Sequence, residues 1–207
     1  MAREQRAAHR SGPVPTSASA GGFEQSGSVS VLPLLRFEYA MRLKRLFPRG
    51  GRLLALGPVE PDLLELLEDA EGPAIVDGRS LDVRLDGAAS GLAEATVSDL
   101  ERAAADLRDR VAPGAPVVIA VAGPRHLRAL SAAAGEADAR RVFGGSVAWR
   151  RRFGLGTLMP AAPMTWPSRF PQAFALLVMA DRLVRGWPGF RSRGSSVVLE
   201  GHLRDSG

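Results

Sequence analysis

The residues whose types and spacing could do chemistry lie between Gly50 and Ser80. An apolar run, RLLALG, ends at a Gly57-Pro58 turn, and a second apolar run, AIVDG, ends on Asp77, 20 positions after Gly57. A buried strand, a tight turn, a helix and a second strand form half of a nucleotide-binding α/β unit, in which ligands bind at the carboxyl ends of the strands. The stretch therefore predicts a ligand site on Gly57 and Asp77.

The elements that must position these residues can be predicted from the hydrophobic periodicity. Apolar residues recur at helical spacing from Leu35 to Phe47, and Pro48 ends that helix. Glu60, Pro61 and Asp62 are typical of a helix start, because proline suits the first helical position and acids complement the helix dipole. A further apolar run, APVVIAVAG, predicts a fully buried central strand.

The remaining chain continues the alternation of strands and helices. Ser98 with Glu101 three residues later forms a capping-box pattern, which predicts a helix from Ser98 to Val111. The other predicted elements are a half-exposed strand in LDVRLDGAAS, a helix in PRHLRALSAAAGEADARR, a short strand at residues 146–149, a helix at residues 171–185 and a final strand in SSVVLEGHL. This order predicts an α/β three-layer sandwich with a mainly parallel sheet.

Composition and charge exclude several classes of protein. The chain has 207 residues and no cysteine, and its three histidines are scattered, so disulfides, thiolate metal sites and zinc sites are not expected. Residues 53–139 carry 7 Arg against 16 acids, whereas the flanks carry 20 basic residues against 6 acids. No aromatic residues interleave with the basic ones as base stacking requires, so nucleic acid is not favoured as a partner.

The expected organisation is one domain at residues 31–207 behind a disordered tail at residues 1–30, which is rich in Gly, Ser, Pro and Ala. The tail has no apolar core of a secretory signal, and the longest apolar runs are too short for a membrane span. We therefore expect a cytoplasmic protein.

The quoted segments resemble the class I S-adenosylmethionine-dependent methyltransferases, of the methyltransferase type 11 kind. The resemblance covers about Leu34 to Leu203 and includes the leading helix FEYAMRLKRLFPRGGR, the turn LLALGPVEPD, the strand end IVDG and the closing LVRGWPGFRSRGSSVVLEGHL. It implies a Rossmann-like sheet and S-adenosylmethionine as cofactor. It also implies that Gly57 approaches the methionine part, that Asp77 accepts hydrogen bonds from the ribose, and that Asp86 contacts the adenine amino group.

The chain departs from the family pattern RVLDLGCGTG at three positions of the turn. Ala55 replaces the first acid, Val59 and Pro61 replace two glycines, and Glu60 is left as a substitute carboxylate. About 22 residues separate Asp77 from Leu100, and no good fourth strand follows Asp86, so the domain is shortened. Two functions stay open: a methyltransferase that acts on a small-molecule acceptor, and a non-catalytic pseudoenzyme that serves as a binding or complex-forming subunit for a protein partner.

Other residues have both a functional and a structural interpretation. Arg150 to Arg152 could bind an anion or form a solvated run before a loop, and His126 could act as a base or be an exposed helix residue. The segment Phe153 to Pro171 would be the natural lid. Within or beside it, four apolar residues could line a substrate pocket or only pack the loop: Trp149, Met159, Met164 and Trp166.

Overall fold

The computed structural model describes residues 30–68, 72–76, 84–92, 95–124, 133–159, 164–191 and 193–205. The predicted N-terminal tail, apart from residue 30, lies outside these ranges, as do Asp77 and His126.

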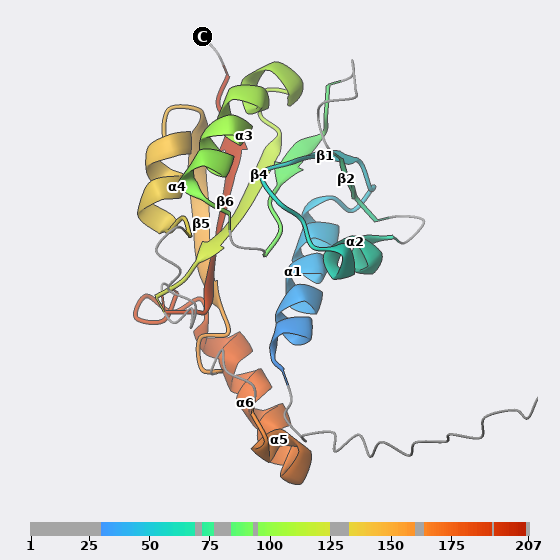
Figure 1. Cartoon of the computed structure of the whole chain (residues 1–207), viewed down its shortest axis with the longest axis vertical. Helices are drawn as coiled ribbons and strands as arrows, with labels where there is room; N and C mark the ends of the chain where they lie inside the picture. Colours follow the sequence, from blue (N-terminus) through green and yellow to red (C-terminus); the bar gives the residue numbers. More distant parts are fainter. Residues whose placement is uncertain are drawn as a thin grey trace, which may run out of the picture.

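One six-stranded sheet forms the middle of the described part of the chain, in the order β2-β1-β3-β4-β6-β5 (Figure 1). The pairs β2-β1, β1-β3 and β3-β4 are parallel, and β6 runs antiparallel to both β4 and β5. The strands are β1 (Arg52–Ala55), β2 (Ala74–Val76), β3 (Gly87–Ala89), β4 (Pro116–Ala122), β5 (Val147–Leu155) and β6 (Ser196–Leu203). The predicted Rossmann-like α/β fold with a mainly parallel sheet is confirmed.

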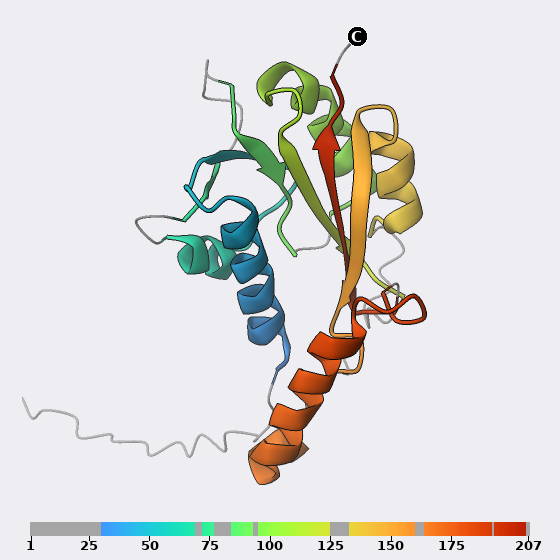
Figure 2. The same cartoon turned by 180° about the vertical axis from the view of Figure 1, so that it is seen from behind.

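Helices cover both faces of this sheet, as Figures 1 and 2 show from opposite sides. Helices α1 (Leu32–Leu46) and α2 (Pro61–Leu67) pack on one face over alternate strand residues such as Leu53 and Val118. Helices α3 (Val97–Arg110) and α4 (Glu136–Phe143) pack on the other face. Successive residues of a strand point to opposite faces of the sheet. A short apolar run in a central strand therefore supplies side chains to both cores, and the helices bury them.

Strand β3 corrects the expectation that no good fourth strand follows Asp86. The sequence Gly-Ala-Ala has no β-branched residue and no alternation, so strand propensity does not indicate it. All three residues are nevertheless buried, because β3 is inserted between β1 and β4 and pairs with both. Strand β3 lies within LDVRLDGAAS, the segment in which a half-exposed strand was predicted, but it is fully buried. Residues 81–83 of this segment lie outside the described residues, and Leu85 forms an isolated bridge.

Helix α3 was predicted at the right place with the wrong cap. Thr96, and not Ser98, is the N-cap: its hydroxyl accepts a hydrogen bond from the Asp99 amide, and the Asp99 carboxylate accepts from the Thr96 amide. Both pairs of residues fit the capping-box pattern, and only the register of the helix distinguishes them.

Strand β5 is longer than the predicted short strand and contains the three arginines that were expected to precede a loop. Arg150 and Arg151 are exposed on this edge strand, and the Arg152 guanidinium donates to Glu136 at 2.7 Å. A register shift between Trp149 and Arg151 changes which face the later residues of β5 point to. Charged side chains on an edge strand discourage pairing with another sheet. This role accounts for Arg150 to Arg152, and no anionic ligand is needed to explain them.

Helices α5 (Trp166–Arg169) and α6 (Pro171–Val184) form an arm that extends past the end of the sheet (Figures 1 and 2). The arm leaves the sheet at the carboxyl end of β5 and returns into β6. None of the helices in the described ranges has the length and apolar character needed to cross a membrane.

Candidate functional site

The Gly57 turn lies at the carboxyl end of β1, where the sequence predicted it. Gly57 has a φ of +106°, a backbone conformation that residues with a Cβ rarely adopt. A cleft of about 600 Å³ opens beside the turn, between the end of β2 and the first turns of α3. This volume is in the range of small-molecule sites. The one glycine that remains of the turn therefore occupies a position whose backbone conformation favours glycine.

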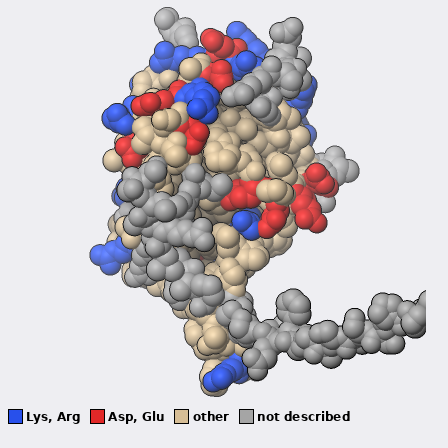
Figure 3. All heavy atoms as spheres, viewed as in Figure 1, with Lys and Arg blue, Asp and Glu red and all other residues tan. Residues whose placement is uncertain are grey.

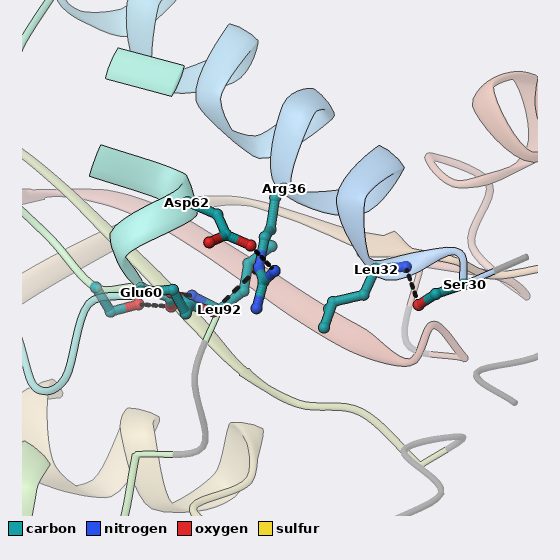
Figure 4. A network of polar contacts seen from close by, with 8 residues as sticks. Ser30, Leu32, Arg36, Glu60, Asp62 and Leu92 are labelled. Atoms are coloured by element: carbon teal, nitrogen blue, oxygen red, sulfur yellow. Dashed lines mark hydrogen bonds and ion pairs between the residues drawn. The ribbon is translucent and has the colours of Figure 1, made fainter. Parts of the chain in front are cut away.

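The Glu60 carboxylate, the candidate substitute for the missing acid, is held by the protein itself. One of its oxygens accepts a hydrogen bond from the Leu92 amide at 3.0 Å, and the other lies 3.9 Å from the Arg36 guanidinium of α1. Arg36 also donates to Asp62 at 2.5 Å, so α1, the start of α2 and the loop after β3 are tied together (Figure 4). Glu60 thus acts in this structure as a bridge between loops.

The loop after β3 lies directly against the Gly57 turn. A Cβ added to Gly91 would lie 2.5 Å from a carboxylate oxygen of Glu60 and 2.6 Å from the Pro58 carbonyl oxygen. Gly91 therefore packs closely against the turn, and not even a methyl group would fit between them at this point. In parallel α/β folds the ligand crevice lies between such loops at the carboxyl ends of the strands. Among the described residues this crevice is closed at Gly91, whereas the cleft on the α3 side of the Gly57 turn is open.

Behind this contact, the end of β3 is fixed by buried polar groups. The Tyr39 hydroxyl donates to the Ser90 carbonyl at 2.8 Å, and the Ser90 hydroxyl accepts from the Ala120 amide at 2.8 Å. Tyr39 is fully buried, and this burial raises the pKa of its phenol far above the usual range. Tyr39 is therefore a neutral structural donor, and the backbone after β3 is held in place from α1 and β4.

The structure does not bring Asp86 to the same edge of the sheet. Asp86 precedes β3 and its carboxylate accepts a hydrogen bond from the Arg52 amide at 2.8 Å, at the start of β1. Gly57 lies five residues further along β1 and its turn, on the order of 17 Å away at about 3.3 Å per residue. Among the described residues, the candidate site thus comprises Gly57 and Glu60. Asp86 lies at the opposite end of the strands, and Asp77 follows β2 in the sequence but is not among the described residues.

Three polar residues of α3, Asp99, Arg102 and Asp106, line the cleft and were missed from the sequence. Asp99 and Arg102 face the cleft beside Gly57, with an N–O distance of 3.4 Å between them. Hydrogen bonds from the Thr96 amide and hydroxyl lower the pKa of Asp99. The signal that could have found Asp99 is its position in the first turn of a helix that follows a strand, since such a turn lies at the carboxyl edge of the sheet.

The apolar residues that could have lined a substrate pocket belong to the two cores. Met159 and Met164 are buried among residues of α1, and Trp166 packs edge-on against Phe174 of α6 with ring centroids 5.9 Å apart. Trp149 packs against the core on the other face of the sheet. They therefore do not share one pocket, and the packing interpretation fits these four side chains.

No family model and no curated protein matches this chain. Solved structures similar to it include N-methyltransferase NodS from Bradyrhizobium japonicum WM9 in complex with S-adenosyl-L-homocysteine, at 11% identity and a TM-score of 0.48, over 83% of this chain and 88% of that chain. A chain in the complex of the Haloferax volcanii Trm112 methyltransferase activator and the putative methyltransferase matches at 12% identity and 0.48, over 86% and 95%.

A third similar structure is magnesium protoporphyrin IX methyltransferase (ChlM) from Synechocystis PCC 6803 with bound S-adenosylhomocysteine, at 10% identity and a TM-score of 0.46, over 84% of each chain. These proteins belong to the class that the sequence resemblance named. At TM-scores below 0.5, none of the similarities assigns a ligand or a reaction to this chain.

The residues present do not fit the whole of S-adenosylmethionine. The cleft beside Gly57 has room for a nucleoside, whereas Gly91 packs so closely against the Gly57 turn, where the methionine part would extend, that a methyl group would not fit there. Ala55 supplies no carboxylate there, and Glu60 already accepts a hydrogen bond from the protein.

Proposed function

We propose that this protein is a methyltransferase-like protein that does not transfer methyl groups and instead acts as a binding or complex-forming subunit. The observation that carries the proposal is the close packing of Gly91 against the Pro58–Glu60 turn, which leaves no room for a methyl group at this point of the crevice in which a methyl donor would have to lie. Large apolar side chains exposed on the arm support a binding role, because such patches mark contact surfaces.

A second candidate is methyl transfer from S-adenosylmethionine to a small-molecule acceptor. The cleft of about 600 Å³ beside Gly57 favours this candidate, and Asp77 directly follows β2 in the sequence. In this candidate Gly57, Glu60 and Asp77 would contact the cofactor. The acceptor would have to enter beside the cofactor, and the closed crevice opposes such a path.

Calorimetric titration with S-adenosylmethionine and S-adenosylhomocysteine separates the two candidates. We expect no binding up to about 1 mM ligand, which corresponds to a binding free energy weaker than about −4 kcal/mol. Micromolar binding that is lost in Asp77→Ala and kept in Asp86→Ala would contradict the proposal and support the enzyme. Asp86→Ala is the matched control because it removes an aspartate from the opposite end of the sheet.

A further inference from the structure

Helix α6 is held firmly against the domain through its inner face. Asp181 is buried, and its carboxylate accepts a hydrogen bond from the Leu158 amide at 2.6 Å. Glu38 of α1 accepts hydrogen bonds from Arg182 and, at 2.6 Å, from Arg185. The orientation of α6 relative to the sheet is therefore defined by two buried carboxylates.

The outer face of α6 is apolar and exposed. Leu176, Met179 and Leu183 recur at positions i, i+3 and i+7 and are 66%, 59% and 72% exposed, and Trp187, just past the helix, is 60% exposed. We call these four residues the α6 stripe. Side chains at this spacing lie on one side of a helix, so α6 presents an exposed apolar stripe opposite its anchored inner face. A stripe of this kind is normally covered by a partner or a lipid phase.

The charges around the α6 stripe are almost all positive. Residues 164–195 contain one acid, Asp181, which is buried. The same segment contains five arginines, of which Arg182 and Arg185 pair with Glu38, so the basic rim consists of Arg169, Arg191 and Arg193. In Figure 3 the described surface of the arm shows apolar or neutral side chains and a basic tip, with no acidic side chain. An apolar stripe with a basic rim fits a partner that presents an apolar layer beside negative charge.

We propose that the α6 stripe docks this protein onto an anionic membrane surface. An anionic bilayer offers an acyl boundary for the leucines and the methionine, headgroup level for Trp187, and lipid phosphates for the arginines. The 14 residues of α6 are about 21 Å long at 1.5 Å per residue, which suits a helix that lies in the plane of the interface.

A second copy of the chain fits the α6 stripe less well. Arg169 lies before α6, and Arg191 and Arg193 lie after it, so both ends of the helix are basic. Two copies paired through the α6 stripe would therefore place arginines near arginines whether the two helices ran parallel or antiparallel. Like charges placed opposite each other oppose association. Membrane docking uses another surface than the Gly57 cleft, so it stands whether or not that cleft binds a ligand.

Co-sedimentation with lipid vesicles tests the proposal on the full chain. We expect partition onto phosphatidylcholine vesicles with about 30% phosphatidylglycerol, and at least about tenfold less onto pure phosphatidylcholine. The triple variant Leu176→Ser, Met179→Ser, Leu183→Ser should lower the partition at least about tenfold. The matched control Leu32→Ser removes an exposed leucine of α1 outside the arm and should leave the partition unchanged.

Two further measurements keep the proposal falsifiable. Arg191→Glu with Arg193→Glu should weaken partition onto the anionic vesicles, and added salt should do the same. Circular dichroism on every variant checks that it folds. A wild-type chain that stays in the supernatant, or equal partition of the wild type and the folded triple variant, overturns the proposal. A dimer in lipid-free sedimentation equilibrium that the triple variant abolishes would assign the stripe to a second copy and overturn it as well.

Discussion

The two halves of the sheet differ in the length of their strands. Strands β1, β2 and β3, whose carboxyl ends form the candidate site, have four, three and three residues. Strands β4, β5 and β6 have seven, nine and eight. The long half pairs over its full length and supplies most strand residues of the core beneath α3 and α4. The comparison shows that the long strands β4, β5 and β6 provide most of the pairing of the sheet, whereas β1, β2 and β3, which end at the candidate site, are only three or four residues long.

The largest effect is expected where the long half is most tightly packed. A Cβ on Gly123, directly after β4, would lie 2.0 Å from the Gly194 carbonyl oxygen before β6. Gly123→Ala should lower the free energy of unfolding by about 3 kcal/mol or more, because backbone must move to admit the methyl group. Urea denaturation measures this loss.

Gly186→Ala is the control for this change, because nothing lies within 4 Å of a Cβ at that position. Its effect should stay within about 0.5 kcal/mol. Equal losses of unfolding free energy in Gly123→Ala and Gly186→Ala would show that the junction of β4 and β6 is packed no more tightly than an exposed turn.

A smaller effect is expected where the arm joins the rest of the domain. The Glu38 side chain is 5% exposed and accepts from two arginines that are 48% and 30% exposed. Glu38→Gln should cost about 1–2 kcal/mol of stability, less than a fully buried pair, because the arginines can reach water. Faster hydrogen exchange in α6 than in α3 would show that the loss is local to the arm.

Glu65→Gln is the matched control, since Glu65 is exposed on α2 and makes no side-chain ion pair among the described residues. It should leave both stability and exchange unchanged. A loss in Glu38→Gln that is spread evenly over the sheet would mean that the arm and the long half form one cooperative unit.

The smallest of the three stability effects is expected at the start of α3, beside the cleft. Asp99→Asn should cost about 1 kcal/mol at neutral pH, the size of a helix cap, because Asp99 accepts from the Thr96 amide and hydroxyl. Since the pKa of Asp99 is lowered in the fold, its stabilisation is fully present above the unfolded value of 3.8 and is lost as the pH falls below it. Urea titrations between pH 7 and about pH 3 should show the difference from wild type shrink.

If the stability difference between wild type and Asp99→Asn stays the same across this pH range, the ionised carboxylate of Asp99 does not contribute to the stability of α3. Glu101→Gln is the control, because the sequence pattern with Ser98 suggested Glu101 as the capping acid and the structure gives that role to Asp99.

Much of the fold follows from the sequence because hydrophobic periodicity reports burial directly. The runs that became β1, β4 and β6 are β-branched or leucine-rich, and the spacing of Leu35, Tyr39 and Leu43 predicts the buried face of α1. A strand was predicted in LDVRLDGAAS, but the position and full burial of β3 could not be predicted, because its Gly-Ala-Ala sequence owes its conformation to its neighbours on both sides. The same holds for the bulge in β5, which depends on the pairing with β6.

The candidate site was predicted only in its local part. The Gly57 turn follows from the sequence because glycine and proline act through their own backbone. The bond from the Leu92 amide to Glu60 and the contact at Gly91 join residues about 30 positions apart. Such contacts depend on how two loops approach across the sheet. The family resemblance implied that Asp86 contacts the ligand, whereas the structure places Asp86 beside Arg52 at the start of β1.

The closed crevice is tested most directly by the backbone amide signals of Gly57, Gly91 and Leu92 in a ¹⁵N–¹H NMR spectrum recorded with and without S-adenosylhomocysteine. The contact between Gly91 and the Gly57 turn predicts that these signals do not move at about 1 mM ligand, and that the Leu92 amide stays slow to exchange with solvent because it donates to Glu60. Saturable shifts confined to these three amides, together with fast exchange at Leu92 before ligand is added, would show an open crevice and contradict the account.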